Sequence, residues 1–403
     1  MSIKQKIISC VAALALAATS AVSFTGCADV SYALVVDGVT IPAGVYILYS
    51  GYALNDAEDK LAEEQPDLDT SAEGFDYYEQ TVSGMSFADY VKQETVNYCK
   101  RYVAVNRLFD ELGIQYEADE LENMNDNIND QWDFSVSGWT NYLSYLNGFS
   151  TLGDYYQSIG VAKSSYKSVL ISGSKSGEIF DYYYGEGGVE EVPRSEIEKY
   201  VGENYTLARY FSISLKDDEG EVIEDKDKLA ELEEIANGYV DDLNGGASYS
   251  EVYEKYEKYF NDKEDEDEDE DEEEHEHEDS DYDRIISVTS TSPSEEFVEA
   301  LFKQDYGTAA LFKADTYYYV VQRLDITENE EYVDDYVDTA LSALKNDELE
   351  DVFEAKYAGY SVTENNSAPD YARQQASNAR QGLTTISSIQ YYSYYSSLFS
   401  SSY

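Results

Sequence analysis

The chain has 403 residues, and 83 Asp and Glu against 27 Lys and Arg give it a formal net charge of −56. Such an acidic surface excludes nucleic-acid binding by phosphate neutralisation and docking on anionic lipid through basic side chains. The two histidines, His275 and His277, lie within one acidic run, so neither a Ser-His-Asp triad nor an HExxH zinc helix is expected. No Gly-rich phosphate or dinucleotide loop is present, and we predict no cofactor and no metal site.

The first 26 residues have the pattern of a secretory signal. Lys4 and Lys6 precede an apolar, Ala-rich stretch over 7–24, and small residues follow it. The Gly26-Cys27 ending resembles the bacterial lipobox, which implies that residues 1–26 are removed and that Cys27 carries the lipid anchor. A membrane-spanning helix is the alternative, because the stretch has borderline length. Once the signal is removed and Cys27 lipidated, Cys99 is alone, and we predict a small buried hydrophobic residue there.

The first half of the mature chain has mainly helical patterns. Residues 32–41 predict a hairpin with a tight Asp37-Gly38 turn, and Pro42 can begin a helix. A polar loop is expected over 63–84. Apolar positions at spacings of three and four run from the cap Ser86 to Gly113 and predict one continuous helix. A second helix is expected over 121–132, with shorter helical pieces as far as residue 184.

The second half alternates between strands and helices. The acidic run over 262–283 has 17 acidic residues in 22, and we predict a disordered loop that binds hard cations weakly at most. The tail over 365–403 is rich in Ser and Tyr. Strands are expected at 207–215, 309–312 and 317–324, and helices at 193–200, 228–243, 250–259, 295–302 and 332–357.

Several local patterns, taken in order, resemble the SurA/PrsA group of extracytoplasmic folding factors. The segment Val36-Asp37-Gly38-Val39-Thr40-Ile41 resembles the opening hairpin of that group, and the helix ending at Leu112-Gly113-Ile114 resembles its central chaperone helix. Residues 206–327 resemble a parvulin prolyl-isomerase domain. Ala208-Arg209-Tyr210 stands where parvulins have Ala-Arg-His, and Tyr318-Tyr319-Val320-Val321 resembles the final Gly-Tyr-His-Ile-Ile strand.

This resemblance implies an α+β fold. A mostly helical chaperone-like domain would consist of residues 27–205 and of a C-terminal helix over 328–364 that returns to it. A parvulin-like domain over 206–327, with a four-stranded antiparallel sheet plus helices, would be inserted between these two segments. The protein would be lipid-anchored on the extracytoplasmic face of a Gram-positive cell membrane.

Both parvulin histidines are replaced, by Tyr210 and Tyr319, so the resemblance implies a degenerate pocket without catalytic residues. The residues expected to bind exported, unfolded polypeptides are then Tyr210, Phe297, Phe302 and Tyr319. A packed aromatic pair of purely structural role is the simpler interpretation of the two tyrosines. Two other functions remain open: an active prolyl isomerase, which would lower the rotation barrier of about 18–20 kcal/mol, and a surface adhesin or glycan-binding lipoprotein.

Overall fold

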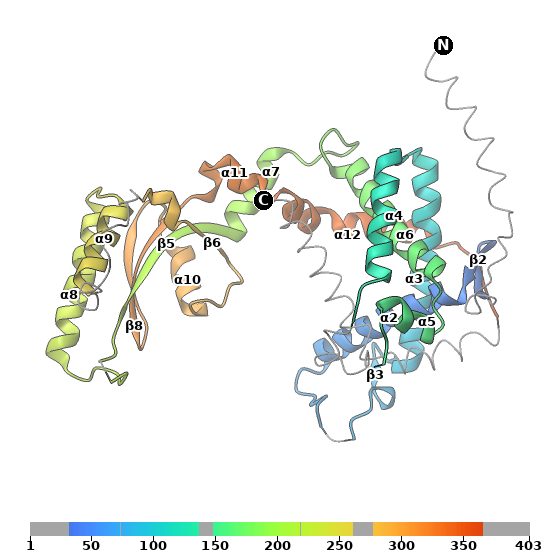
Figure 1. The fold of residues 1–403 in the computed structure, drawn as a ribbon, viewed down its shortest axis with the longest axis horizontal. Coiled ribbons are helices and arrows are strands. Elements are labelled where there is room, and N and C mark those ends of the chain that lie inside the picture. The colour runs from blue at the N-terminus through green and yellow to red at the C-terminus, as the bar shows by residue number, and fades with distance from the viewer. Residues whose placement is uncertain (1–31, 73, 137–147, 218, 261–276, 366–403) are drawn as a thin grey trace, which may run out of the picture. The chain divides into compact units, whose positions relative to one another are not determined.

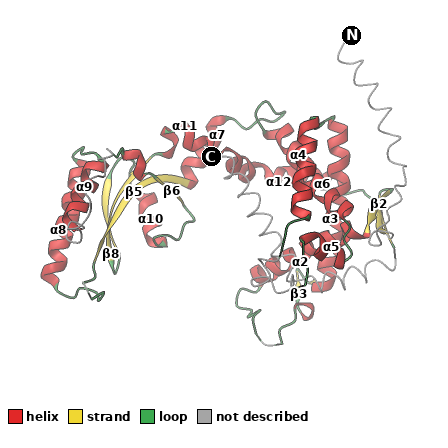
Figure 2. Cartoon of the chain, in the orientation of Figure 1, coloured by secondary structure: helices red, strands yellow, loops and turns green. Residues whose placement is uncertain are grey.

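The computed structural model describes residues 32–72, 74–136, 148–217, 219–260 and 277–365 (Figure 1). The chain divides into two compact units, Met1–Tyr182 with Glu348–Tyr403, and Tyr183–Asp347. The predicted α+β class is confirmed, since helices predominate and the strands form small antiparallel sheets (Figure 2). The second unit extends beyond the expected 206–327 at both ends.

The first unit is helical, with a small sheet at the ends of its described chain. Strand β1 pairs with β2 and, on its other edge, with β9, so residues 362–364 lie beside residues 34–36. The elements of this unit are β1 (Tyr32–Val36), β2 (Val39–Pro42), α2 (Ala43–Glu64), η2 (Tyr77–Glu79), β3 (Thr81–Val82), β4 (Met85–Ser86), α3 (Phe87–Leu112), α4 (Ala118–Trp132), α5 (Leu152–Ser158), most of α6 (Lys163–Tyr184), the end of α12 (Val337–Tyr357) and β9 (Val362–Glu364).

Helix α3 forms as its sequence signals predict. The Ser86 hydroxyl accepts a hydrogen bond from the Asp89 amide at its start, and Gly113 ends it with a left-handed φ of 73°. The buried stripe packs on α2, and Cys99 within it is fully buried, as expected. The returning part of α12 is tied to α3 by an Arg101–Glu350 ion pair.

The second unit is built around an antiparallel sheet with strand order β6-β5-β8-β7. The long central pair runs in register from Leu207↔Leu324 to Ser214↔Tyr317. The elements are α7 (Arg194–Asn204), β5 (Tyr205–Ser214), α8 (Lys226–Asn244), α9 (Tyr249–Phe260), η4 (Asp279–Tyr282), β6 (Arg284–Ser287), α10 (Glu295–Lys303), β7 (Ala309–Lys313), β8 (Tyr317–Leu324), η5 (Ile326–Glu328), α11 (Glu330–Asp334) and the start of α12.

Helices cover both faces of this sheet (Figure 1). Because side chains alternate along a strand, β5 sends Phe211 and Ile213 to one face and Ala208 and Tyr210 to the other. Helices α8 and α9 pack on the first face, which we call the α8–α9 face. Helix α10 packs on the second, the α10 face.

Three sequence predictions need correction. Residues 277–283, expected to be disordered with the rest of the acidic run, are ordered and contain η4, because the partly buried Arg209 holds two of their carboxylates. The helix expected over 332–357 is broken: α11 ends at Asp334 and α12 begins at Val337. Between them, Tyr336 packs its ring 4.2 Å from that of Tyr205. The pieces expected before residue 184 include one helix of 22 residues, α6.

Candidate functional site

An aromatic cluster occupies the α10 face of the second unit. Tyr210 of β5 and Tyr319 of β8 meet edge to face, with ring centres 6.1 Å apart. Phe297 of α10 lies over both, 5.2 Å from Tyr210 and 5.3 Å from Tyr319. Phe297 is buried, whereas both tyrosines are only partly buried. The structure therefore brings together three of the four residues expected to bind a polypeptide.

Three further side chains extend this cluster. Phe312 of β7 contacts Phe297, and Tyr317 lies 5.9 Å from Tyr319 along β8. The exposed Arg284 places its guanidinium 4.5 Å from the ring centre of Tyr210, a cation–π geometry. We define the aromatic face as Tyr210, Arg284, Phe297, Phe312, Tyr317 and Tyr319.

The Tyr319 hydroxyl is a neutral hydrogen-bond donor near pH 7. Partial burial, and then the neighbouring Tyr317 and Tyr210, raise the pKa of Tyr319 above its usual range. A neutral hydroxyl can donate to a carbonyl oxygen, but this one is not poised to act as a base at neutral pH. The aromatic face therefore offers rings, a hydrogen-bond donor and one guanidinium, a combination that suits contact with a peptide.

A cavity of about 400 Å³ opens beside this cluster, between α10 and the edge strand β7. Its lining is mainly apolar and includes Phe297, Ala300, Leu301, Ala310, Phe312 and Val321. Phe297 and Phe312 are shared between the cavity and the aromatic face. A side chain entering the cavity would thus contact the same rings that border the exposed tyrosines.

Phe302, the fourth expected binding residue, lies at the border of the same core and is outside the ring cluster. The Arg323 guanidinium lies 5.2 Å from its ring centre. Arg323 is itself buried and donates to the carbonyl oxygens of Phe302 and Gln304. Phe302 therefore belongs to the packing around a buried guanidinium that ties α10 to the sheet.

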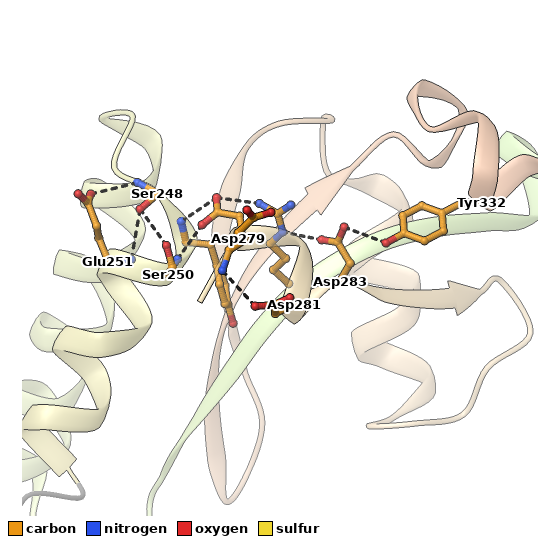
Figure 3. A network of polar contacts seen from close by, with 10 residues as sticks. Ser248, Ser250, Glu251, Asp279, Asp281, Asp283 and Tyr332 are labelled. Atoms are coloured by element: carbon orange, nitrogen blue, oxygen red, sulfur yellow. Dashed lines mark hydrogen bonds and ion pairs between the residues drawn. The ribbon is translucent and has the colours of Figure 1, made fainter. Parts of the chain in front are cut away.

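The α8–α9 face carries a polar network instead (Figure 3). Arg209 of β5 donates from Nε to Asp283 Oδ1 at 2.6 Å and from a terminal nitrogen to Asp279 Oδ2 at 3.0 Å. The side chains of Arg209 and Asp283 are only 15% and 9% exposed. Tyr332 donates its hydroxyl to the second oxygen of Asp283 at 3.3 Å. We call Arg209, Asp279, Asp283 and Tyr332 the carboxylate clamp.

Asp279 also caps helix α9. Its carboxylate accepts from the backbone amides of Tyr249 and Ser250 at 3.1 and 2.9 Å. Burial by itself would raise the pKa of Asp279, but these hydrogen bonds and the Arg209 charge outweigh burial and lower it. The clamp therefore fixes the end of the acidic run to the sheet through ionised groups, and it has a structural role.

Other predicted features lie elsewhere or outside the described residues. Cys27 lies outside them. None of the described helices is long and apolar enough to span a membrane. Burial raises the pKa of the Cys99 thiol far above its usual range, which leaves it unreactive. Over the part of the chain that the structure describes, no cluster of His, Cys, Asp or Glu is arranged to hold a metal ion.

Sequence reasoning missed the contributions of Arg284, Phe312 and Tyr317. The alternation of Tyr317 and Tyr319 along one strand was a readable signal, because residues two apart share a face. Phe312 faces Tyr319 across the short hairpin of β7 and β8, which was also a local signal. Arg284 reaches the cluster through β6, and the pairing of β6 with β5 across a long connection has no local sequence signal.

The chain matches no protein-family model, and no curated protein matches it in sequence. Among solved structures, it is similar to a foldase protein PrsA from Streptococcus pneumoniae str. Canada MDR_19A, with 13% identity, 71% of this chain and 95% of that chain covered, and a TM-score of 0.30. It is also similar to a foldase protein (PrsA) from Lactococcus lactis, with 14% identity, 86% and 99% covered, and a TM-score of 0.32. Similarity at this level assigns neither a fold nor a function to the chain.

Proposed function

We propose that the protein is a chaperone-like lipoprotein that binds exported, unfolded polypeptides on its aromatic face without catalysing a reaction. Cys27 carries the lipid anchor, and the folded units lie outside the cytoplasmic membrane. No nucleic acid and no cofactor takes part. The observation that carries this proposal is the partly exposed cluster of Tyr210, Phe297 and Tyr319 beside an apolar cavity.

The chemistry of the aromatic face fits unfolded chains rather than one folded partner. Aromatic rings offer a large contact area to apolar and aromatic side chains of any sequence, and tyrosine hydroxyls can bond exposed backbone carbonyls. The net negative charge of the chain keeps the protein soluble and disfavours acidic clients. We therefore expect weak binding of segments rich in aromatic and basic residues.

Suppression of aggregation by the mature protein tests the proposal. A denatured secreted protein is diluted with and without an excess of the chain, and light scattering is followed. We expect Tyr319→Ser to lose most of the protection. Tyr259→Ser is the matched control, because Tyr259 is 51% exposed on α9 and lies outside the aromatic face. Equal scattering with and without the wild-type protein contradicts the proposal.

An active prolyl isomerase is the second candidate, favoured by the neutral Tyr319 hydroxyl on the α10 face. That hydroxyl could hydrogen-bond a prolyl substrate while the X-Pro bond rotates. A protease-coupled assay on an X-Pro peptide distinguishes the two functions. We expect the uncatalysed rate for the wild type and for Tyr210→Phe and Tyr319→Phe. A wild-type acceleration that either Phe variant removes would favour the isomerase instead.

A further inference from the structure

Strand β7 is the outermost strand of its sheet among the described residues, and its outer backbone groups are only partly paired. It pairs with β8 along one edge. On the other edge, the Asn244 side chain takes the place of a neighbouring strand at Ala309, donating to the Ala309 oxygen at 2.9 Å and accepting from its nitrogen at 2.8 Å. Because backbone groups alternate between the two edges of a strand, those of Leu311 and Lys313 face the same side as those of Ala309. No described residue forms a hydrogen bond with them there.

The cavity of about 400 Å³ lies beside this edge. Strand β7 contributes Ala310, Leu311 and Phe312 to its lining, and α10 contributes Phe297 and Ala300 among others. A strand added beside β7 would send every second side chain toward the α10 face, where the cavity can accept one of them. Main-chain pairing combined with a pocket for one side chain is the way in which sheet edges bind extended peptides. The edge therefore suits an extended segment with a large apolar or aromatic side chain.

The charges around this edge favour basic residues in the bound segment. Two lysines beside the edge already have carboxylate partners on the same chain, Lys303 with Glu299 and Lys313 with Glu233. The exposed Asp305 and Asp315 lie just before and just after β7, and neither forms an ion pair with a described residue. Both ends of the edge thus carry a negative charge without a cation. Lysine or arginine toward the ends of an added strand would complement these charges, and an acidic strand would be repelled.

We propose that the outer edge of β7 binds unfolded client polypeptides by strand addition. The bound segment is extended, places one aromatic or large apolar side chain in the cavity and carries basic residues toward its ends. The inference rests on the proposed function for the identity of the natural ligand and adds the mode of binding. Since main-chain pairing is open to any extended sequence, the cavity and the flanking charges select by residue type, and clients of many sequences can bind.

A peptide titration tests this mode of binding. The protein is the mature chain, and the probe is a fluorescent peptide of alternating Thr and Val with one central Phe and a Lys at each end. We expect saturable binding. Replacing the central Phe by Ala should weaken binding at least about tenfold, as loss of a central anchor does. Replacing both Lys by Glu should also weaken it, most strongly at low salt. Absence of binding, or equal binding of the three peptides, would overturn the proposal.

Two matched protein variants locate the binding site. Ala300→Trp fills the cavity from an exposed position on α10 and should weaken binding of the Phe peptide at least about tenfold. Ala230→Trp adds the same side chain at an exposed position on α8, outside the cavity, and should leave binding unchanged. Circular dichroism checks that both variants are folded. Equal binding by two folded variants would contradict the proposed site.

N-methylation of the peptide backbone tests the added strand. Only every second amide of an edge strand faces its partner. Peptides methylated at one or the other alternate set of amides should therefore divide into one that binds and one that does not. Equal binding of the two methylated peptides would exclude strand addition.

A second copy of the chain is the competing occupant of this edge. Sedimentation of the mature protein separates the two cases: we expect a monomer, and a dimer that Ala300→Trp dissociates would overturn the proposal. The aggregation assay keeps this inference distinct from the proposed function. Protection of a denatured protein by a chain that does not bind the Phe peptide would overturn strand addition alone. Peptide binding at the edge without such protection would support the site and contradict the chaperone-like function.

Discussion

The two faces of the four-stranded sheet are built from the same strands and differ in how fully they are covered. On the α8–α9 face, Phe211 lies within ring contact of four tyrosines from two helices, Tyr239, Tyr249, Tyr253 and Tyr256. On the α10 face, one helix of nine residues leaves Tyr210 and Tyr319 partly exposed beside a cavity.

This difference separates stability from binding within one sheet. Two helices and the carboxylate clamp close the α8–α9 face, so substitutions there should act on folding. The α10 face keeps apolar area in contact with solvent, which stabilises the fold less and leaves that area available for a ligand. Substitutions at neighbouring residues of β5 should therefore differ in effect: those facing α8 and α9 should lower stability, and those facing α10 should weaken binding.

The largest expected effect comes from Phe211→Ala. Removing a buried ring that several others contact should lower the free energy of unfolding by about 3–5 kcal/mol. Tyr210→Ala, one residue away on the other face, should cost only about 1–2 kcal/mol, because its ring is partly exposed, and should abolish protection in the aggregation assay. Urea denaturation measures both changes. Equal losses of stability would show that the two faces contribute equally to folding.

The next effect concerns the carboxylate clamp. Arg209→Met leaves Asp283 buried without its cation and should lower the free energy of unfolding by about 3 kcal/mol. Lys255→Met is the control, since it removes a surface ion pair with Asp242 and should lower the free energy of unfolding far less than Arg209→Met does. If urea denaturation finds the two variants equally stable, the clamp does not hold the acidic run to the sheet.

The smallest effect is a pH dependence carried by Asp279. The pKa of Asp279 is lower in the folded protein than in the unfolded chain. Its contribution to stability is therefore present above the unfolded-state pKa of about 3.9 and is lost as pH falls through the folded-state pKa. Asp279→Asn should therefore be less stable than the wild type at pH 6, and the gap should narrow below about pH 4. Urea denaturation at both pH values checks this. A gap that is constant with pH would show that ionisation of Asp279 does not stabilise the fold.

Local sequence signals predicted most elements of the fold. Ser86, the apolar stripe and Gly113 define α3 because capping and periodicity depend on residues close in sequence. The Asp37-Gly38 turn was equally readable, since both residues adopt the positive φ that this tight turn requires. The break between α11 and α12 was not readable, because the apolar pattern continues across it and the Tyr336–Tyr205 contact spans more than a hundred residues.

The candidate site was predicted in part. Tyr210 and Tyr319 were identified through a resemblance to parvulins, and the register of β5 and β8 does bring them together. Phe302 was grouped with them by sequence, yet the buried guanidinium of Arg323 fixes its surroundings. Which aromatic residues of a short helix face a sheet depends on the rotation of that helix, and only its packing sets this.

The sequence by itself determined the acidic composition, the α+β class, the order of the elements and the place of the acidic run. These depend on residue type and on spacings of a few positions. Tertiary structure alone decided that residues 277–283 are ordered, that Arg209 pairs with Asp279 and Asp283, and that a cavity opens beside β7. Each of these requires side chains from different strands and helices to meet, and such meetings are set by strand register and helix packing.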